Sequence, residues 1–403
     1  MAQSESGAIS FRLQAAVYIC GIFSSGTSNI VWVVVPLWLV KLDASPMMIG
    51  ISLGAYTFLP LLLSIPGGAL IDRLGARRVI TVFGALVVCL TPLYPFLPWI
   101  PALIVLQMLV GLAISMGWIS AQALVGQRMQ GHPTYAGRLA FVTRLGTLVG
   151  PPLVGAIWDL FGEVGAFLFM TLWTSGVLLA VAILPRAEDD PVAAPADIRI
   201  ADFRPRIQAY RDAVALLAIP AILLVVMISV LRQSGQGIQS SFYVVYLESI
   251  GLTGTAIGTL TSAFLVVGAF GALTTGPLTR LFNRFWLLMA TVALSVVFIS
   301  ITPLLATYAL LMLAIVARGA ALGTVQPLML SIIAQAADSS DQGKAVALRA
   351  TANRLAMTVI PVIMGAVVEL VGIRNAFLVV GGVLLALLAC LALYMRRMDN
   401  LTR

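Results

Sequence analysis

Long apolar blocks dominate the sequence, and short polar segments separate them. Each block holds about 20 to 25 residues, the length that an α-helix needs to cross roughly 30 Å of hydrocarbon. The pattern predicts twelve membrane-spanning helices over 14–40, 47–71, 79–98, 101–126, 139–161, 164–184, 216–247, 254–277, 285–305, 308–336, 345–371 and 374–395. Because these spans and their connections use almost the whole chain, we expect an all-α membrane protein without a soluble domain.

Composition and charge support this interpretation. Hydrophobic residues make up 60% of the 403 residues and charged residues 10%, whereas soluble domains carry about 25% charged residues. Most of the 24 lysines and arginines, Arg349 among them, fall on one side of the predicted membrane, and only Lys41 and Arg374 fall on the other. The positive-inside rule then places both termini in the cytoplasm. We expect a multi-pass protein of the cell inner membrane, surrounded by the lipid bilayer, whose net charge of +8 reflects topology and not nucleic-acid binding.

The segment 185–215 is long, polar and rich in proline and arginine, and it predicts a cytoplasmic linker between an N-terminal bundle, 1–184, and a C-terminal bundle, 216–403. The two halves are related in sequence. Numbering offsets of 208 and 210 align ordered pairs: Leu39 with Leu247, Gly50 with Gly258, Gly68 with Gly276, Arg144 with Arg354, Pro151 with Pro361, and Asp159 with Glu369. A parallel repeat predicts two pseudo-symmetric six-helix bundles with a substrate site between them near the bilayer midplane.

Few residues have the spacing of a chemical centre. Cys20, Cys89 and Cys390 lie far apart in apolar spans, and His132 is the single histidine. No Cys or His spacing of a metal site is present, and no phosphate-binding glycine loop is present. We therefore expect no cofactor, no metal and no enzymatic activity. Because no nucleotide-binding site is present, any active transport must be driven by an ion gradient, in which the coupling ion need not be the proton, or by exchange with a counter-anion.

The loop after the second span reads Gly68-Ala69-Leu70-Ile71-Asp72-Arg73-Leu74-Gly75-Ala76-Arg77-Arg78. It resembles the signature of the major facilitator superfamily, G-x-L-x-D-R-x-G-x-R-R. The resemblance covers essentially the whole chain and implies the twelve-helix fold of that family, transport of a small molecule by alternating access, and a monomer. A solvated positive loop explains the arginines but not the full spacing.

By this resemblance, Asp72 and Arg73 belong to a charge latch on the cytoplasmic side. We group Gly68, Gly75, Arg77 and the cytoplasmic Arg138 with them as gating residues. In the second half, Arg280 occupies the acidic position, so we expect the first half alone to carry the latch.

The fifth span contains Gly146, Gly150, Pro151 and Gly155. This pattern is similar to the antiporter motif of the superfamily, with Val154 at one glycine position, and it implies export. The alternative is ordinary packing of small residues between helices.

The fourth span and the acidic residues differ from the pattern of drug:proton antiporters in this family. Gln107 occupies the position where these proteins usually carry an arginine, and no acidic residue lies in mid-membrane. These differences weigh against proton-coupled multidrug efflux, which we keep as the alternative function. A non-transporting receptor or scaffold would need no polar midplane, and nothing specific suggests lipid flipping.

The membrane interior instead contains arginines. Arg232 and Arg318 lie near the middle of spans, where a charge costs a few kcal/mol and must find partners. A guanidinium binds carboxylate or phosphate well, so we expect these two residues to bind an organic anion, with Gln122, Gln236 and Tyr243 in the same cavity. The alternative is bonding to backbone carbonyls or glutamines. Arg144 and Arg354 are either further charge sites or arginines that reach the membrane edge or cap carbonyls.

Overall fold

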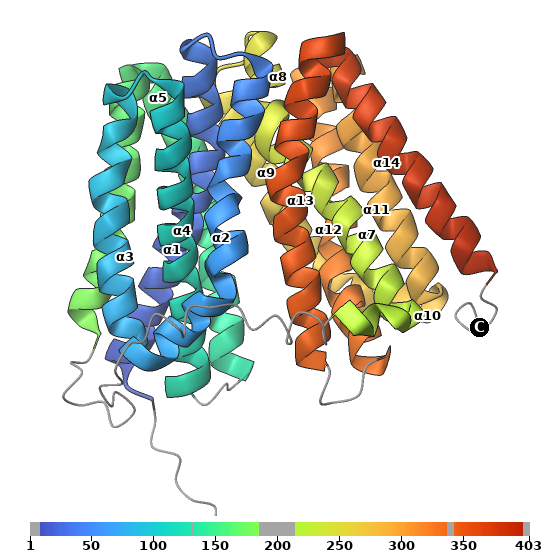
Figure 1. Cartoon of the computed structure of the whole chain (residues 1–403), viewed down its shortest axis with the longest axis horizontal. Coiled ribbons are helices and arrows are strands. Elements are labelled where there is room, and N and C mark those ends of the chain that lie inside the picture. Colours follow the sequence, from blue (N-terminus) through green and yellow to red (C-terminus); the bar gives the residue numbers. More distant parts are fainter. Residues whose placement is uncertain (1–8, 130–132, 185–213, 337–341, 398–403) are drawn as a thin grey trace, which may run out of the picture.

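The computed structural model describes residues 9–129, 133–184, 214–336 and 342–397, and every regular element in these ranges is helical (Figure 1). The first half contains α1 (Phe11–Lys41), α2 (Pro46–Leu74), α3 (Ala76–Leu90) with the short turn η1 (Thr91–Phe96), α4 (Ile100–Arg128) and α5 (Pro133–Ile183). The second half contains η4 (Leu216–Ala218), α7 (Pro220–Ile238), η5 (Gln239–Tyr243), α8 (Val244–Ser249), α9 (Gly254–Leu273), α10 (Thr275–Leu281), α11 (Arg284–Ser300), η6 (Thr302–Leu304), α12 (Tyr308–Ala336), α13 (Gln342–Val371) and α14 (Ile373–Arg396). The prediction of an all-α membrane protein is confirmed.

Within the described ranges, ten helical segments are long and apolar enough to cross a membrane. One of them, Thr134–Ile183, holds two predicted spans, because Gly162 interrupts the helical backbone with φ 67°. Gly372 has φ 79° at the repeat-related position. Both turns require a backbone conformation that residues with a Cβ disfavour. Arg284–Ser300 is a shorter apolar helix at the ninth predicted span, so helices occupy all of the predicted span positions.

The two halves meet along two interfaces that are copies of each other. In one, α5 packs against α9, and in the other, α13 packs against α2. A Cβ atom on Gly258 would lie 2.2 Å from the carbonyl oxygen of Pro151, and one on Gly50 would lie 2.3 Å from that of Pro361. These pairs obey the offsets of 208 and 210, and such close backbone contact requires glycine. The repeat in the sequence is therefore a repeat of the contact between the halves.

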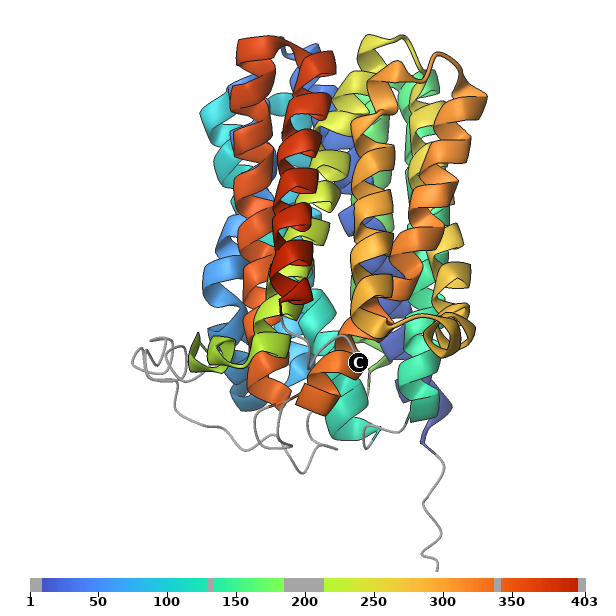
Figure 2. The same ribbon diagram turned by 90° about the vertical axis from the view of Figure 1, so that its right-hand side faces the viewer.

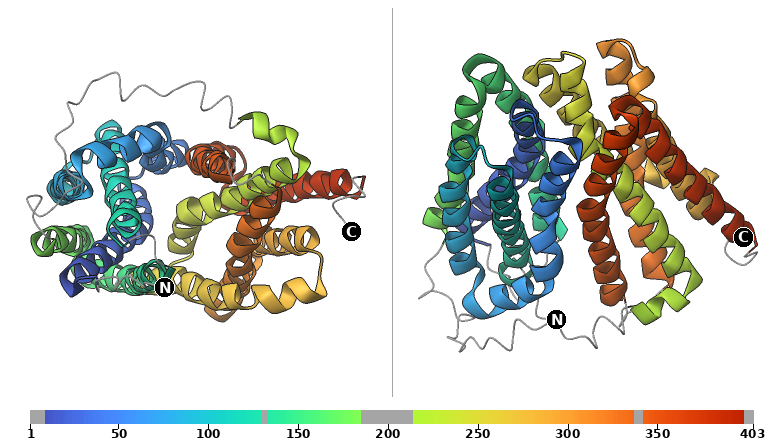
Figure 3. Two further views of the ribbon diagram at one scale, coloured as in Figure 1. Left: turned by 90° about the horizontal axis from the view of Figure 1, so that it is seen from below. Right: turned by 45° about the horizontal axis from the view of Figure 1, so that its top comes forward.

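We call the end of the molecule that carries the described ends of the chain and the α2–α3 turn the terminal end, and the other the distal end. Helices of the two halves approach each other at the distal end and diverge toward the terminal end (Figures 1 and 3). The hydrogen bonds that join described residues of the two halves run from Asp159–Thr255 at the distal end to Thr57–Thr358 and Arg354–Pro60 at mid-depth. This conformation is closed at the distal end.

The side view in Figure 2 shows the long helices running between the same two ends, so each half can place side chains at mid-depth on facing surfaces. The predicted linker lies almost entirely outside the described residues. The assignment of the terminal end to the cytoplasm stays a prediction from charge.

Candidate substrate-binding site

The C-terminal half buries Arg318 on α12, and this side chain is 0% exposed. Its guanidinium carbon lies 4.9 Å from the ring centroid of Phe264. Its Nε donates to the carbonyl oxygen of Ser295 at 3.2 Å, and its Nη2 donates to that of Gly235 at 3.0 Å. Its Nη1 has no hydrogen-bond partner in the part of the chain that the structure describes. Arg318 therefore bonds backbone carbonyls, as one alternative held, and no described carboxylate neutralises its charge.

Two more arginines of the same half have incomplete hydrogen bonding. Arg232 on α7 is half-buried, and its Nη2 donates to Oε1 of Gln233. Arg349 on α13 is 6% exposed, and its Nη1 donates to Oε1 of Gln326 at 3.1 Å. The Nε of each has no hydrogen-bond partner within the described ranges. Because the charge of Arg232 also interacts with those of Arg318 and Arg349, this part of the molecule is electropositive.

The other predicted binding residues take different places. Gln236 is half-buried on α7, next to the Gly235 carbonyl that accepts from Arg318. Tyr243 is buried in the π-helical turn η5, and no described residue forms a hydrogen bond with its hydroxyl. Such π-helical turns occur often at functional sites. Gln122 is exposed on α4 in the N-terminal half, whereas the other four residues belong to the C-terminal half.

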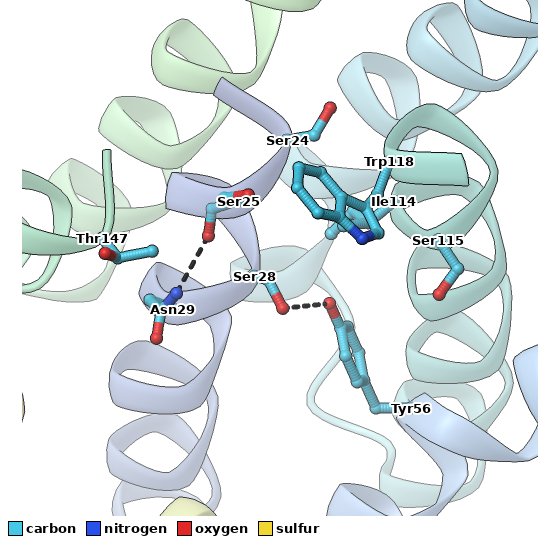
Figure 4. Close-up of a pocket in the computed structure, with 9 residues that line it drawn as sticks. All are labelled: Ser24, Ser25, Ser28, Asn29, Tyr56, Ile114, Ser115, Trp118 and Thr147. Carbon is cyan, nitrogen blue, oxygen red and sulfur yellow. Dashed lines mark hydrogen bonds between the residues drawn. The ribbon is translucent and has the colours of Figure 1, made fainter. Parts of the chain in front are cut away.

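A polar pocket lies in the N-terminal half between α1, α2, α4 and α5 (Figure 4). Its volume is about 260 Å³, and none of its lining residues is charged. Hydroxyl, amide and indole groups dominate the lining, including those of Ser25, Ser28, Asn29, Tyr56, Ser115 and Trp118. The Tyr56 hydroxyl donates to Ser28 Oγ at 3.0 Å, and Asn29 Nδ2 donates to the Ser25 carbonyl at 3.0 Å. The pocket thus offers neutral hydrogen-bonding groups beside two aromatic rings.

The antiporter-like residues of α5 make close helix contacts. A Cβ on Gly146 would lie 2.3 Å from the carbonyl oxygen of Ile22, and one on Gly150 would lie 3.1 Å from the Ile30 side chain, both on α1. A Cβ on Gly155 would lie 2.1 Å from the carbonyl oxygen of Gly254, across the interface with α9. Together with Pro151, these residues hold α5 against its own half and against the other half.

The signature motif occupies the end of α2 and the start of α3. Gly75 lies between the two helices with φ 80°, a backbone conformation that glycine adopts readily, and so permits the tight turn there. Gly68 lies on α2. The side chains of Asp72 and Arg73 lie outside the described residues, so the predicted latch stays a prediction.

Two further gating candidates belong to the terminal end. Arg77 is half-buried at the start of α3. Arg138 on α5 donates from Nη1 to Oε1 of Gln14 at 3.3 Å, and its guanidinium carbon lies 5.8 Å from the ring centroid of Tyr135. In this conformation, Arg138 joins α5 to α1 within one half.

Arg144 and Arg354, the repeat-related pair, both reach into the opposite half. Nη1 of Arg354 donates to the carbonyl oxygen of Pro60 at 2.8 Å, and Nη1 of Arg144 donates to that of Leu265 at 3.5 Å. The predicted alternative of carbonyl capping describes both contacts. Because the carbonyls belong to the other half, the two arginines connect the bundles near mid-depth.

Acidic side chains strengthen the distal end. Asp159 accepts from the backbone N–H of Gly254 at 2.7 Å, from that of Thr255 at 2.8 Å and from the Thr255 hydroxyl at 2.6 Å. Lys41 Nζ lies 2.5 Å from Glu163 Oε2, and this hydrogen bond lowers the pKa of the Glu163 carboxyl. The first contact connects the two halves, and the second lies within one half.

The prediction from sequence missed Arg349 and its neighbour Asn353. Arg349 was assigned to the cytoplasmic side, but it lies in α13, which begins at Gln342, and it is buried. Asn353, one turn further along, accepts from Ser229 Oγ at 2.7 Å and so joins α13 to α7. Positions 349 and 353 lie on one helical face, and this polar stripe inside a predicted span was the signal that could have identified them.

Comparison with known proteins fits this architecture. The family model described as Major Facilitator Superfamily matches residues 17–234 and 225–401. No curated protein matches the chain significantly in sequence.

Similar solved structures share the fold at low sequence identity. The nucleoside transporter NupG is 15% identical with a TM-score of 0.75, over 94% of this chain and 98% of its own. A peptide transporter POT in complex with sulfate is 15% identical with a TM-score of 0.75, over 97% and 96%. A POT family transporter in complex with 5-aminolevulinic acid is 12% identical with a TM-score of 0.73, over 97% and 96%. The family match and the shared fold identify a membrane transporter and not an enzyme, and the chain belongs to the major facilitator superfamily.

Proposed function

We propose that this protein is a secondary active transporter that exports a small organic anion by alternating access. The observation that carries the proposal is the group of Arg232, Arg318 and Arg349, each with a guanidinium N–H that has no hydrogen-bond partner among the described residues. Charges inside a membrane protein are costly and are commonly functional. Carboxylate or phosphate oxygens of a substrate would supply the acceptors that the described residues lack.

The three arginines have different tasks in this proposal. Arg232 contacts the substrate directly, because its side chain is half-buried while Arg318 is fully enclosed. Arg318 contributes its charge and holds the Gly235 carbonyl, about one turn along α7 from Arg232. Arg349 adds a third charge from α13, and Gln326 orients it.

Alternating access requires that the halves rock between two closed ends. The glycine contacts of α5 with α9 and of α13 with α2 provide smooth surfaces for this motion. The present conformation is closed at the distal end, and with the topology that the positive-inside rule predicts this is a cytoplasm-facing state. Export as the direction is supported by the resemblance of the Gly146–Gly155 segment to the antiporter motif.

Proton-coupled multidrug efflux has less support. Gln107, at the position where such pumps carry an arginine, is buried and accepts from the Tyr94 hydroxyl at 2.8 Å. None of the described carboxylates faces the arginines, so nothing in the described site favours a cationic drug.

The test is uptake of radiolabelled mono-, di- and tricarboxylates and organophosphates into everted membrane vesicles, where export appears as accumulation. We expect uptake of one of these anions that falls at least tenfold in Arg232→Gln, since hydrogen bonds to charged groups are the strong ones. Arg280→Gln is the matched control, because Arg280 is exposed at the terminal end. Transport of lipophilic cations alone, or anion uptake that is unchanged in Arg232→Gln and Arg318→Gln, contradicts the proposal.

A further inference from the structure

We infer that the substrate is a polyhydroxylated anion of monosaccharide size, whose anionic group meets the C-terminal arginines while its uncharged, hydroxyl-bearing body occupies the polar pocket of the N-terminal half. This inference rests on the proposed function and adds the chemistry of the second part of the substrate. The internal repeat of the chain relates the pocket to the arginines.

Near the site, helix contacts in the two halves are equivalent at the smaller of the two repeat offsets, 208. A Cβ on Gly111 would meet the carbonyl oxygen of Tyr56, and a Cβ on Gly319 would meet that of Phe264 at 2.5 Å. Gly319 is the repeat counterpart of Gly111, and Phe264 is the counterpart of Tyr56, both at this offset. The α2–α4 pair and the α9–α12 pair therefore pack with the same register.

The repeat also relates the contacts of α1 to those of α7. A Cβ on Gly21 would lie 3.0 Å from Thr143, and Ser229 donates to Asn353 at 2.7 Å. Ser229 is the counterpart of Gly21 at the smaller offset, and Asn353 is the counterpart of Thr143 at the larger offset, 210. The residues of α1 that follow Gly21 therefore correspond to residues of α7 at the same offset of 208.

Applied to the site, the smaller offset pairs the neutral pocket with the cationic group. Ser24 corresponds to Arg232, Ser25 to Gln233, Ser28 to Gln236, Trp118 to Gln326 and Tyr56 to Phe264. Gln326 holds Arg349, and Phe264 lies against Arg318. Ser24 of the pocket thus occupies the position equivalent to Arg232. Tyr56 and Trp118 occupy the positions equivalent to the residues that contact Arg318 and Arg349.

Equivalent positions in two parallel repeats face each other across the pseudo-symmetry axis. One substrate between the halves would therefore contact both sets, with different chemistry on each side. The C-terminal side offers guanidinium groups, and the N-terminal side offers only neutral donors and acceptors. A substrate with a charge at one end and hydroxyl groups at the other satisfies both sides.

The size and lining of the pocket narrow the neutral part. A volume of about 260 Å³ lies near the lower end of the range of small-molecule sites, roughly 300 Å³, which suits a body of about six carbons with hydroxyl groups. Serine hydroxyls and the Asn29 amide can donate hydrogen bonds to such hydroxyls or accept them, and the Trp118 indole can donate to them. A site built to bond hydroxyls discriminates strongly against analogues that lack them.

The experiment measures ligand binding to the purified full-length protein by isothermal titration calorimetry. The probes are gluconate, hexanoate, glucose and glucose 6-phosphate, which separate charge, hydroxyl groups and the type of anion. We expect gluconate or glucose 6-phosphate to bind at least tenfold more tightly than hexanoate and glucose. The comparison of the two hydroxylated anions distinguishes a carboxylate from a phosphate substrate.

Two pocket variants, Ser115→Ala and Trp118→Phe, each remove one donor without removing an internal hydrogen bond of the described structure. We expect each to weaken binding of the hydroxylated anion about threefold to tenfold while hexanoate binding stays the same. Ser175→Ala is the control, since Ser175 bonds the Leu172 carbonyl outside the pocket.

The outcomes separate this inference from the proposed function. Equal binding of gluconate and hexanoate that depends on Arg232 refutes the inference and leaves anion transport intact. Binding of glucose but of no anion refutes the proposed function. Pocket variants that bind every probe like the parent protein also refute the assignment of the hydroxyl groups to this pocket.

Discussion

The carboxylate of Asp159 provides a direct test of how the distal end is held closed. It accepts three hydrogen bonds from Gly254 and Thr255 at the start of α9, and thereby caps a helix of the other half. A carboxylate at a helix N-terminus is favoured by the helix dipole and by the free N–H groups there. Opening the distal end breaks all three bonds, so Asp159 stabilises the closed state relative to the open one.

The size of the effect follows from these bonds. A hydrogen bond to a charged group contributes about 1.5–3 kcal/mol when it is buried, and exposure of Asp159 reduces this through water. We therefore take about 1–2 kcal/mol for the whole contact. Asp159→Ala then shifts the equilibrium toward distal opening by about 5- to 30-fold.

The assay is double electron–electron resonance between spin labels at Trp99→Cys and Leu304→Cys, two exposed positions at the distal end in different halves. The three native cysteines are replaced first. In the parent protein we expect one short distance, and in Asp159→Ala we expect a second, longer distance with a substantial population. The sample is measured in lipid without ligand.

The repeat supplies the matched control. Glu369 corresponds to Asp159, but it is exposed, and the residue that corresponds to Gly254 is Pro46, which has no N–H to donate. Glu369→Gln should leave the distance distribution unchanged. If Asp159→Ala also leaves it unchanged, or if Glu369→Gln has the same effect, the capping argument is refuted.

Three other predictions follow from contacts of the described residues. Gly258→Ala places a Cβ against a backbone carbonyl and should destabilise the distal-closed state by about 1–3 kcal/mol. Gly276→Ala should not, because a Cβ there would have no atom within 4 Å. Melting curves and the same spin labels compare the two variants. Arg354→Gln removes a bond to the other half and should change the rate of transport more than substrate affinity, as initial rates at several concentrations would show. Lys41 lowers the pKa of Glu163. The pair therefore stabilises the protein at pH values above the ordinary glutamate pKa of about 4.3, and this contribution is lost as pH falls through the lower pKa of the folded state. On acidification, the melting temperature of Lys41→Met should fall less than that of the parent protein.

Much of the fold was predictable, because bilayer thickness and hydrophobicity determine where helices form. The repeat also predicted which glycines are equivalent, and Gly50 and Gly258 make equivalent contacts in the structure. Helix irregularity was less predictable. The π-helical turn at Gln239–Tyr243 follows from tertiary packing and has no marker such as a proline in the segment itself.

The site was predictable in residue type but not in geometry. A mid-membrane arginine in the sequence signals function, yet nothing local shows that Arg318 bonds the carbonyls of Ser295 and Gly235. These partners are distant in sequence and are backbone atoms, which every residue possesses. For the same reason, the contact of Arg354 with the Pro60 carbonyl became visible only once α13 and α2 were placed together.

The two halves have kept equivalent residues at the interfaces between them but have diverged at the facing positions at mid-depth. The first region concerns the movement of the halves, and the second concerns the choice of substrate. The interfaces of α5 with α9 and of α13 with α2 keep equivalent glycine contacts, as the proposed alternating access requires of surfaces that slide. The facing positions at mid-depth differ in charge, with Ser24 where the other half has Arg232. A symmetric substrate would favour equal chemistry on both sides. Unequal chemistry on a symmetric scaffold is expected instead when the two ends of the substrate differ, as in an anion with a neutral body.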